Sequence, residues 1–114
     1  MRRSGIFGPA EDWPAQDLIA FSADFDADLV VEAYRAGVFP MPLHASGFGE
    51  MGWWSPVRRG ILTLEGLRVT RSMRKAARHY TTTVDSAFHR VLAACADPSR
   101  PNGWIDAEIE RVYT

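Results

Sequence analysis

The sequence predicts a small single domain of the α+β class, with about four helices and a few short strands. Two stretches, after Asp26 and after Asp85, repeat apolar side chains at the spacing of one helix face. Short runs at 60–64 and 81–84 have the composition of strands. The chain has 114 residues, of which 46% are hydrophobic and 24% charged, which suits one domain with one core.

The first part of the chain, residues 1–17, is rich in Gly, Pro, Asp and Glu and shows no sustained period. We expect an irregular N-terminal arm here, held in place by Phe7 and Trp13. The predicted domain then covers residues 18–114.

The first predicted helix begins at Asp26 or Asp28, either of which can cap its free N–H groups. Its end is predicted at Gly37, because glycine readily adopts the left-handed conformation that terminates a helix. The apolar face consists of Leu29, Val30, Ala33 and Tyr34.

Residues 37–59 are predicted to form a long loop, because three prolines and four glycines interrupt regular structure. A loop of this length in a small domain is typical of a binding site. Its prolines are Pro40, Pro42 and Pro56, and its aromatic anchors are Phe39, Phe48, Trp53 and Trp54.

After the loop, residues 60–64 are predicted to form a strand, and Leu67 with Val69 a second short one. A helix is expected to begin after Thr70 or Ser72 as N-cap and to run to about Tyr80. The β-branched run 81–84 follows as a further strand.

Two helices complete the chain. The first is expected to begin at Asp85 and to end before Asp97 and Pro98, with Cys95 buried on its apolar face. The second is expected to be capped by Asp106. Its apolar side consists of Ile105, Ile109, Val112 and Tyr113.

The charges are separated along the chain although the formal net charge is only −1. Residues 51–80 carry seven Lys or Arg and one acid, Glu65, which gives +6 locally. Five of these cations recur at steps of three or four, and we call them the basic ridge: Arg68, Arg71, Arg74, Lys75 and Arg78. Guanidinium groups bind phosphate through paired hydrogen bonds, so the ridge favours a nucleic-acid backbone. A solvated helix surface is the alternative interpretation, while the few apolar neighbours disfavour a lipid surface.

Tryptophans lie on both sides of this basic stretch in the sequence. Trp53 and Trp54 form an adjacent pair before Pro56, and Trp104 follows Asn102 and Gly103 in a predicted turn. Exposed indole rings stack well on unpaired bases. The alternative is structural: one ring of the pair fills the core, and Trp104 packs at a helix start.

Four segments, taken in order, resemble the leucyl/phenylalanyl-tRNA–protein transferase family. The family's strings GIFPW, WWSP, S-R-S-[ML]-[KR] and GTWI correspond here to GVFPM, WWSP, TRSMRK and NGWI. The likeness covers roughly residues 24 to 113 and identifies 18–114 with the N-terminal portion of such an enzyme. The chain departs from the family at Val57, where the family has Asp, and at Met41, where it has Trp.

The resemblance implies transfer of Leu or Phe from charged tRNA to the N-terminal Arg or Lys of a protein, which marks that protein for degradation by the N-end rule. It implies that Trp104 and the residue at Met41 enclose the terminal adenosine, with Trp53 and Trp54 as further substrate-binding candidates. The family's catalytic Asp and Gln follow the last helix, so no catalytic residue is assigned here. The sequence therefore leaves open a fragment, a truncated reading frame or a loss of catalysis.

Other chemistry finds little support in the sequence. His44, His79 and His89 lie apart without ligand spacing, so we expect no metal site and no cofactor. No secretory leader or membrane span is apparent, and a single cysteine gives no internal disulfide, so a cytoplasmic protein is expected. The alternatives to an enzyme are a catalytically incomplete RNA-binding module and an apolar protein-interaction domain.

Overall fold

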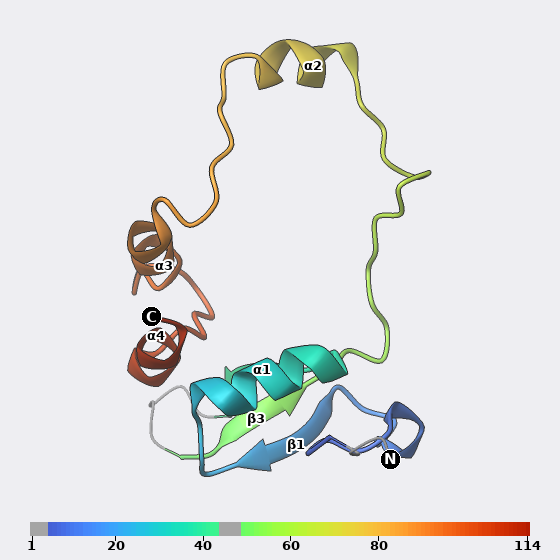
Figure 1. Cartoon of the computed structure of the whole chain (residues 1–114), viewed down its shortest axis with the longest axis vertical. Helices are drawn as coiled ribbons and strands as arrows, with labels where there is room; N and C mark the ends of the chain where they lie inside the picture. Colours follow the sequence, from blue (N-terminus) through green and yellow to red (C-terminus); the bar gives the residue numbers. More distant parts are fainter. Residues whose placement is uncertain (1–4, 44–48) are drawn as a thin grey trace.

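The computed structural model describes residues 5–43 and 49–114. This part of the chain holds four α-helices and three strands, which confirms the α+β class (Figure 1). In chain order the elements are the 3-10 turn η1 (Ala10–Asp12), β1 (Leu18–Ser22), α1 (Ala27–Ala36), β2 (Phe39–Pro42), β3 (Met51–Trp54), α2 (Arg71–Ala77), α3 (Phe88–Cys95) and α4 (Ala107–Tyr113). Phe48 and His44 lie outside the described residues.

The three strands form one antiparallel sheet in the order β1-β3-β2. The prediction of a loop over 37–59 is therefore wrong, since β2 and β3 both fall within it. The prolines argued against a strand here, because proline has no N–H to donate to a strand ladder. However, β2 is an edge strand, where proline is tolerated. Pro40 pairs with Trp53 and Pro42 with Met51, so β3 lies at the centre of the sheet.

Helix α1 agrees with its prediction at both ends. The Asp26 carboxylate accepts a hydrogen bond from the Leu29 N–H at 2.8 Å, as an N-cap does. Gly37 has φ 83°, and the Val38 N–H donates back to the Ala33 carbonyl at 2.8 Å. This left-handed C-terminal motif turns the chain directly into β2.

The core lies between the sheet, α1 and α4. Its buried apolar residues are Val30, Ala33, Val38, Met51, Trp53 and Ile109. Trp53 is 1% exposed, and its indole N–H donates to the Ser22 hydroxyl at 2.8 Å. The indole ring also meets the Phe7 ring edge-on, with 5.5 Å between centroids. The N–H partner makes this deep burial of a polar ring tolerable.

The N-terminal arm is attached through the two side chains that the sequence indicated. Phe7 and Trp13 pack against the core, and the Trp13 indole N–H donates to the Phe7 carbonyl at 2.8 Å. The expected anchoring is confirmed, whereas the boundary between arm and domain at residue 18 stays a prediction.

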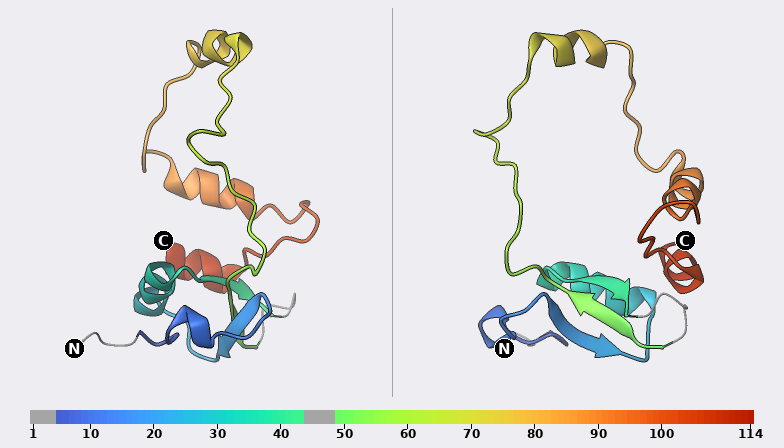
Figure 2. Two further views of the ribbon diagram at one scale, coloured as in Figure 1. Left: turned by 90° about the vertical axis from the view of Figure 1, so that its right-hand side faces the viewer. Right: turned by 180° about the vertical axis from the view of Figure 1, so that it is seen from behind.

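Residues 57–104, which we call the outer segment, leave the sheet, form α2 and return through α3 (Figures 1 and 2). The strands predicted at 60–64, 67–69 and 81–84 are absent from this described stretch. A strand requires a neighbour to accept and donate its backbone hydrogen bonds, and none lies beside these runs. Their local preference for strand is therefore not sufficient.

The helices of the outer segment partly follow their predictions. Thr70 caps α2 by accepting from the Met73 N–H at 3.2 Å, but the helix ends at Ala77 rather than near Tyr80. Helix α3 is present without a cap from Asp85, whose φ of 57° takes the backbone out of helical geometry. Cys95 is exposed rather than buried.

Helix α4 brings the end of the outer segment back to α1. The Asp106 carboxylate accepts from the Ile109 N–H at 2.9 Å, which confirms the predicted cap. Ile109 is buried in the core, and the Tyr34 and Tyr113 hydroxyls form a hydrogen bond between α1 and α4. The chain thus forms a wide arch, which leaves the core after β3, runs through α2 and α3, and returns to the core at α4.

This arch makes the molecule more open than a compact chain of its length. The radius of gyration is 17.5 Å, against about 13 Å for a compact domain of this size. The accessible surface is 9738 Å², against about 6,200 Å² for a folded monomer of this mass. Among the described residues, no helix combines the length and apolarity needed to cross a membrane.

Candidate nucleic-acid interface

Met41 and Trp104 line one hollow, although 62 positions separate them in the sequence. Its volume is about 310 Å³, and the other lining residues are Pro42, Asn102, Gly103, Ile105 and Asp106. We call it the Met41–Trp104 pocket. Met41 supplies a thioether from the edge strand, and Trp104 supplies an indole from the turn before α4. No cation lines it, so the pocket suits an uncharged flat ring better than a phosphate.

The position of Met41 depends on the second tryptophan of the pair. The Trp54 indole N–H donates to the Met41 carbonyl at 3.0 Å, across the pairing of β3 with β2. The indole crosses over Gly52: a Cβ at this residue would lie 2.6 Å from the Trp54 Nε1 and 3.0 Å from the Met41 oxygen. Gly52 therefore leaves the space that this hydrogen bond requires.

The position of Trp104 depends on the turn between α3 and α4. Asn102 has φ 58°, a left-handed conformation that asparagine tolerates, and Asp106 then fixes the start of α4. At the other end of the turn, the Ser99 backbone N–H donates to Asp97 and holds the pKa of that carboxyl below its usual value. Trp104 remains 40% exposed, while its neighbour Ile105 packs on the core. At the start of α4, the side chain that packs on the core is therefore that of Ile105 and not that of Trp104.

Sequence reasoning missed Arg100. This residue, Trp104 and Cys95 line a second hollow of about 460 Å³, which shares residues 102–105 with the Met41–Trp104 pocket. The Arg100 Nε donates to the Ala94 carbonyl at 3.2 Å near the end of α3, which directs its guanidinium to this hollow. Its position four residues before Trp104 in the same turn was the only available signal.

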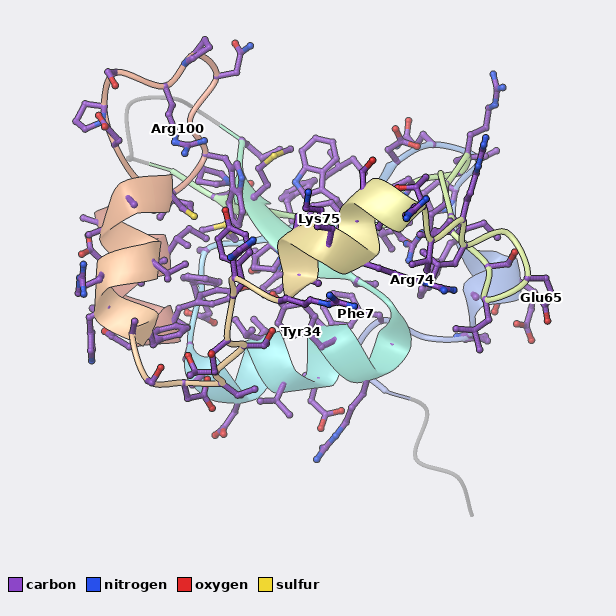
Figure 3. All side chains as sticks on the ribbon, turned by 90° about the horizontal axis from the view of Figure 1, so that it is seen from above. Phe7, Tyr34, Glu65, Arg74, Lys75 and Arg100 are labelled. Carbon is purple, nitrogen blue, oxygen red and sulfur yellow. The ribbon has the colours of Figure 1, made fainter. Side chains whose placement is uncertain are left out.

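The basic ridge lies on α2 and the residues beside it. All five of its side chains are exposed, and none takes part in an ion pair within the described part of the chain. In the view along the long axis, Arg74 and Lys75 project from α2, and Glu65 lies to one side of them (Figure 3). Unpaired cations on one short helix can bind a row of phosphates without first breaking other contacts.

The ridge and the Met41–Trp104 pocket do not adjoin. Helix α2 lies at one end of the 47 Å long axis, and the sheet with α4 lies toward the other (Figures 1 and 2). The basic ridge and Trp104 therefore do not lie together on one side of the structure. Within the described part of the chain, α2 does not pack extensively against the sheet.

The tryptophan pair is also placed differently from the substrate-binding hypothesis. Trp53 has no free ring face for a base, because it is buried between Phe7, Phe25 and the core. Trp54 is half-buried and lines no part of the Met41–Trp104 pocket. The structural alternative for Trp53 thus holds, and Trp54 acts on the pocket through Met41. The described residues contain no group of three His, Cys, Asp or Glu side chains placed to hold a metal ion.

Comparison with known proteins gives two adjoining family matches. The model of the leucyl/phenylalanyl-tRNA protein transferase N-terminal domain matches residues 23–57, and that of leucyl/phenylalanyl-tRNA protein transferase matches residues 61–114. The chain belongs to the leucyl/phenylalanyl-tRNA–protein transferase family. The matched ranges agree with the span over which the four sequence segments resemble this family.

Curated transferases of this family are similar to most of the chain. The protein from Rhodospirillum rubrum is 45% identical over 91 residues, which cover 76% of this chain and 42% of that protein. The protein from Laribacter hongkongensis is 45% identical over 102 residues, covering 85% and 42% respectively. That from Paracoccus denitrificans is 40% identical over 94 residues, covering 81% and 43%. The chain thus spans less than half the length of these transferases.

Proposed function

We propose that this chain is the tRNA-binding part of a transferase that moves Leu or Phe from charged tRNA to the N-terminal Arg or Lys of a protein. Such transfer would mark the acceptor protein for degradation in the cytoplasm. The observation that supports the proposal is the Met41–Trp104 pocket, in which two segments distant in sequence provide the walls for a flat ring. The terminal adenosine of tRNA is such a ring.

The proposed reaction needs positioning more than an unusual catalytic group. The acceptor's α-amine attacks the ester carbonyl, the bond from the acyl carbon to the ribose oxygen breaks, and the proton lost by the amine passes to that ribose oxygen, which leaves as the free hydroxyl. An aminoacyl ester is already activated, so holding its terminal nucleotide beside the amine supplies much of the rate. In this proposal Met41 and Trp104 hold the nucleotide, and no residue of this chain is assigned a catalytic role.

The basic ridge is proposed to bind the tRNA backbone away from its end. An aminoacyl-tRNA is long enough to contact α2 with its stem while its terminal nucleotide occupies the pocket, so the two sites need not adjoin. Arg100, beside Trp104, is placed to contact a phosphate near the terminal nucleotide. Backbone contacts give affinity, and the pocket gives selectivity for the free end.

Charge reversal tests the ridge. We expect Arg74→Glu with Lys75→Glu to abolish tRNA binding at moderate salt, because two phosphate contacts are lost and two repulsions are gained. A milder Arg74→Gln with Lys75→Gln should lower the slope of log K against log salt by about two phosphate equivalents. Arg35→Glu with Arg111→Glu is the matched control, since these exposed cations lie on α1 and α4 in ion pairs. Equal loss in both charge-reversed variants would contradict the assignment.

Removal of the indole tests the pocket. Trp104→Ala should weaken binding of tRNA that carries its terminal adenosine by about 1–3 kcal/mol, the usual contribution of stacking on an aromatic ring. The same substitution should not affect a tRNA that lacks this nucleotide. If both RNAs lose affinity equally, the pocket does not hold the end of the tRNA.

A non-enzymatic RNA-binding module is the second candidate, because the contacts assigned here bind RNA and none of them reacts. Transfer of labelled Phe from Phe-tRNA to a protein that starts with Arg separates the two. We expect tRNA binding without transfer when this chain is tested alone. Burial of Trp53 removes the main support for the third hypothesis, a docking loop for an apolar protein.

A further inference from the structure

A further hollow lies at the start of β2, and none of the contacts assigned above uses it. Its volume is about 430 Å³, and its lining residues are Tyr34, Gly37, Val38, Phe39, Pro56 and Arg59. We call it the Phe39–Arg59 pocket. It shares no lining residue with the Met41–Trp104 pocket. A hollow with two aromatic side chains and a guanidinium suits a flat ring that carries an anionic group.

The two pockets follow one another along the edge strand. Phe39 and Met41 occupy the same face of β2, because alternate side chains of a strand point the same way. Two residues of a strand span about 6–7 Å, a step that one nucleotide of an extended single strand can match. A base held at Met41 therefore leaves the preceding nucleotide within reach of Phe39.

The sheet register places Arg59 beyond Phe39, on the side away from Met41. Trp54 pairs with Phe39 and Gly52 pairs with Met41, so the chain that follows Trp54 continues past Phe39 in that direction. Arg59 belongs to this continuation and lines the pocket from there. The order along the edge of the sheet is thus Met41, Phe39, Arg59.

Three hydrogen bonds hold the segment that carries Arg59. The Ser55 N–H donates to the Asp17 carbonyl at 2.9 Å, and the Val57 N–H donates to the Asp17 carboxylate at 2.8 Å. The Arg59 Nη2 donates to the Ser55 hydroxyl at 3.2 Å. A guanidinium has five N–H groups, and no acid forms an ion pair with this one within the described part of the chain. Arg59 is therefore held at the pocket with N–H groups left to bind an anion.

Charge favours RNA over a peptide as the occupant. Among the described residues, no carboxylate lines the pocket, and the sequence from 51 to 80 carries +6. Such a surface attracts phosphate groups. It repels a peptide that begins with Arg or Lys, which is the acceptor in the proposed reaction.

From these observations we propose that the Phe39–Arg59 pocket binds the penultimate nucleotide of the tRNA, with its base against Phe39 and the phosphate on its 5′ side at Arg59. The inference rests on the proposed function, because it takes the terminal nucleotide to occupy the Met41–Trp104 pocket. It adds a direction for the RNA strand, which runs from Met41 past Phe39 toward Arg59. The outer segment leaves the sheet at this end and leads to the basic ridge (Figure 1).

Three tRNAs test the assignment: one with its complete 3′ end, one that lacks the last nucleotide and one that lacks the last two. Binding to the whole chain is measured by fluorescence anisotropy at several salt concentrations. Arg59→Gln should weaken binding of the first two RNAs about threefold to tenfold and lower their slope of log K against log salt by about one phosphate equivalent. It should not affect the third RNA, which lacks the penultimate nucleotide together with its phosphate.

Two other variants sharpen the test. Arg58→Gln is the matched control, since Arg58 is an exposed neighbour that does not line the pocket. It removes the same charge and should act alike on all three RNAs. Phe39→Leu keeps an apolar side chain but removes the ring, so it should weaken binding of the first two RNAs by at least about threefold and leave the third unchanged.

The outcomes separate this inference from the proposed function. If Trp104→Ala acts only on the complete tRNA while Arg59→Gln acts equally on all three RNAs or on none, the Met41–Trp104 pocket stands and the inference is overturned. Identical behaviour of Arg58→Gln and Arg59→Gln on every RNA would also overturn it. Weaker binding of an acceptor peptide by Arg59→Gln, with unchanged binding of tRNA, would identify a peptide as the occupant. If Trp104→Ala acts equally on complete and shortened tRNA, the proposed pocket fails and the inference fails with it.

Discussion

Residues 18–56 and the outer segment are both rich in apolar side chains, but they use them differently. The first region packs α1 on a sheet around Trp53 and receives α4, which returns Ile109 to the same core. The outer segment contributes no buried hydrophobic residue among those described. The difference shows that hydrophobicity and strand preference give a fold only where the chain also supplies the facing surface.

The first prediction tests how far stability depends on the packed region. Trp53→Ala should lower the free energy of unfolding by about 3–5 kcal/mol, because it leaves a large cavity and removes the partner of the Ser22 hydroxyl. Denaturant unfolding of this variant measures the effect. Leu64→Ala in the outer segment is the control and should change stability by no more than about 0.5 kcal/mol. Comparable losses would show that the two regions share one core.

Glycines provide a second comparison between the regions. Gly52→Ala should cost about 1–3 kcal/mol, because its Cβ would clash with the Trp54 indole and the Met41 carbonyl. It should also weaken binding of the tRNA end, by displacing Met41. Gly60→Ala is the matched control, since a Cβ there meets no atom within 4 Å. Unfolding and binding are measured on both variants, and equal behaviour would contradict the role given to Gly52.

The cap of α4 joins the outer segment to the packed region, and it gives the third prediction. Asp106→Ala should destabilise the protein by about 1 kcal/mol, because the Ile109 N–H loses its acceptor. Thermal unfolding measures the loss. Asp106→Asn retains a capping oxygen and should nearly restore stability. If Asp106→Asn is as unstable as Asp106→Ala, the charge of Asp106 rather than its capping hydrogen bond stabilises the protein.

The smallest expected effect concerns the contact of Tyr34 with Tyr113. Burial, followed by the hydrogen bond from Tyr34, raises the pKa of Tyr113 above its usual value. A pKa raised by folding gives stability that is complete below the unfolded pKa of about 10 and is lost as pH rises through the folded value. An absorbance titration should show one of the three tyrosines ionising late.

Two phenylalanine variants assign that late titration. Tyr34→Phe should bring it closer to the usual range, whereas Tyr80→Phe, at an exposed residue of the outer segment, should leave it unchanged. Three tyrosines that titrate together would contradict the contact between α1 and α4.

The helices could be predicted because their signals are local. Asp26 and Asp106 cap helices in the structure as the sequence indicated, and Gly37 ends α1 in the left-handed conformation. The strands could not be predicted, because pairing depends on residues distant in sequence. Prolines in an edge strand made β2 hard to predict, and the runs at 60–64 and 81–84 indicated strands for which the described part of the chain offers no neighbour.

The candidate site also has some features that the sequence predicted and others that only the structure showed. The basic ridge follows from spacing alone, and Trp104 was identified by its motif. That Met41 faces the same hollow as Trp104, and that Trp54 holds the Met41 carbonyl, required the sheet register and the return of α4. Arg100 joined the site only because the turn places it beside Trp104.

By itself, the sequence determined the family, the α+β class, the helix caps and the separation of charge. These features depend on residues within a few positions of one another, or on ordered motifs. Only the tertiary structure decided which tryptophan is buried, which side chains line the pocket and where α2 lies relative to it. Those outcomes depend on contacts between distant segments, and such contacts form only where two surfaces of the chain can exclude water from each other.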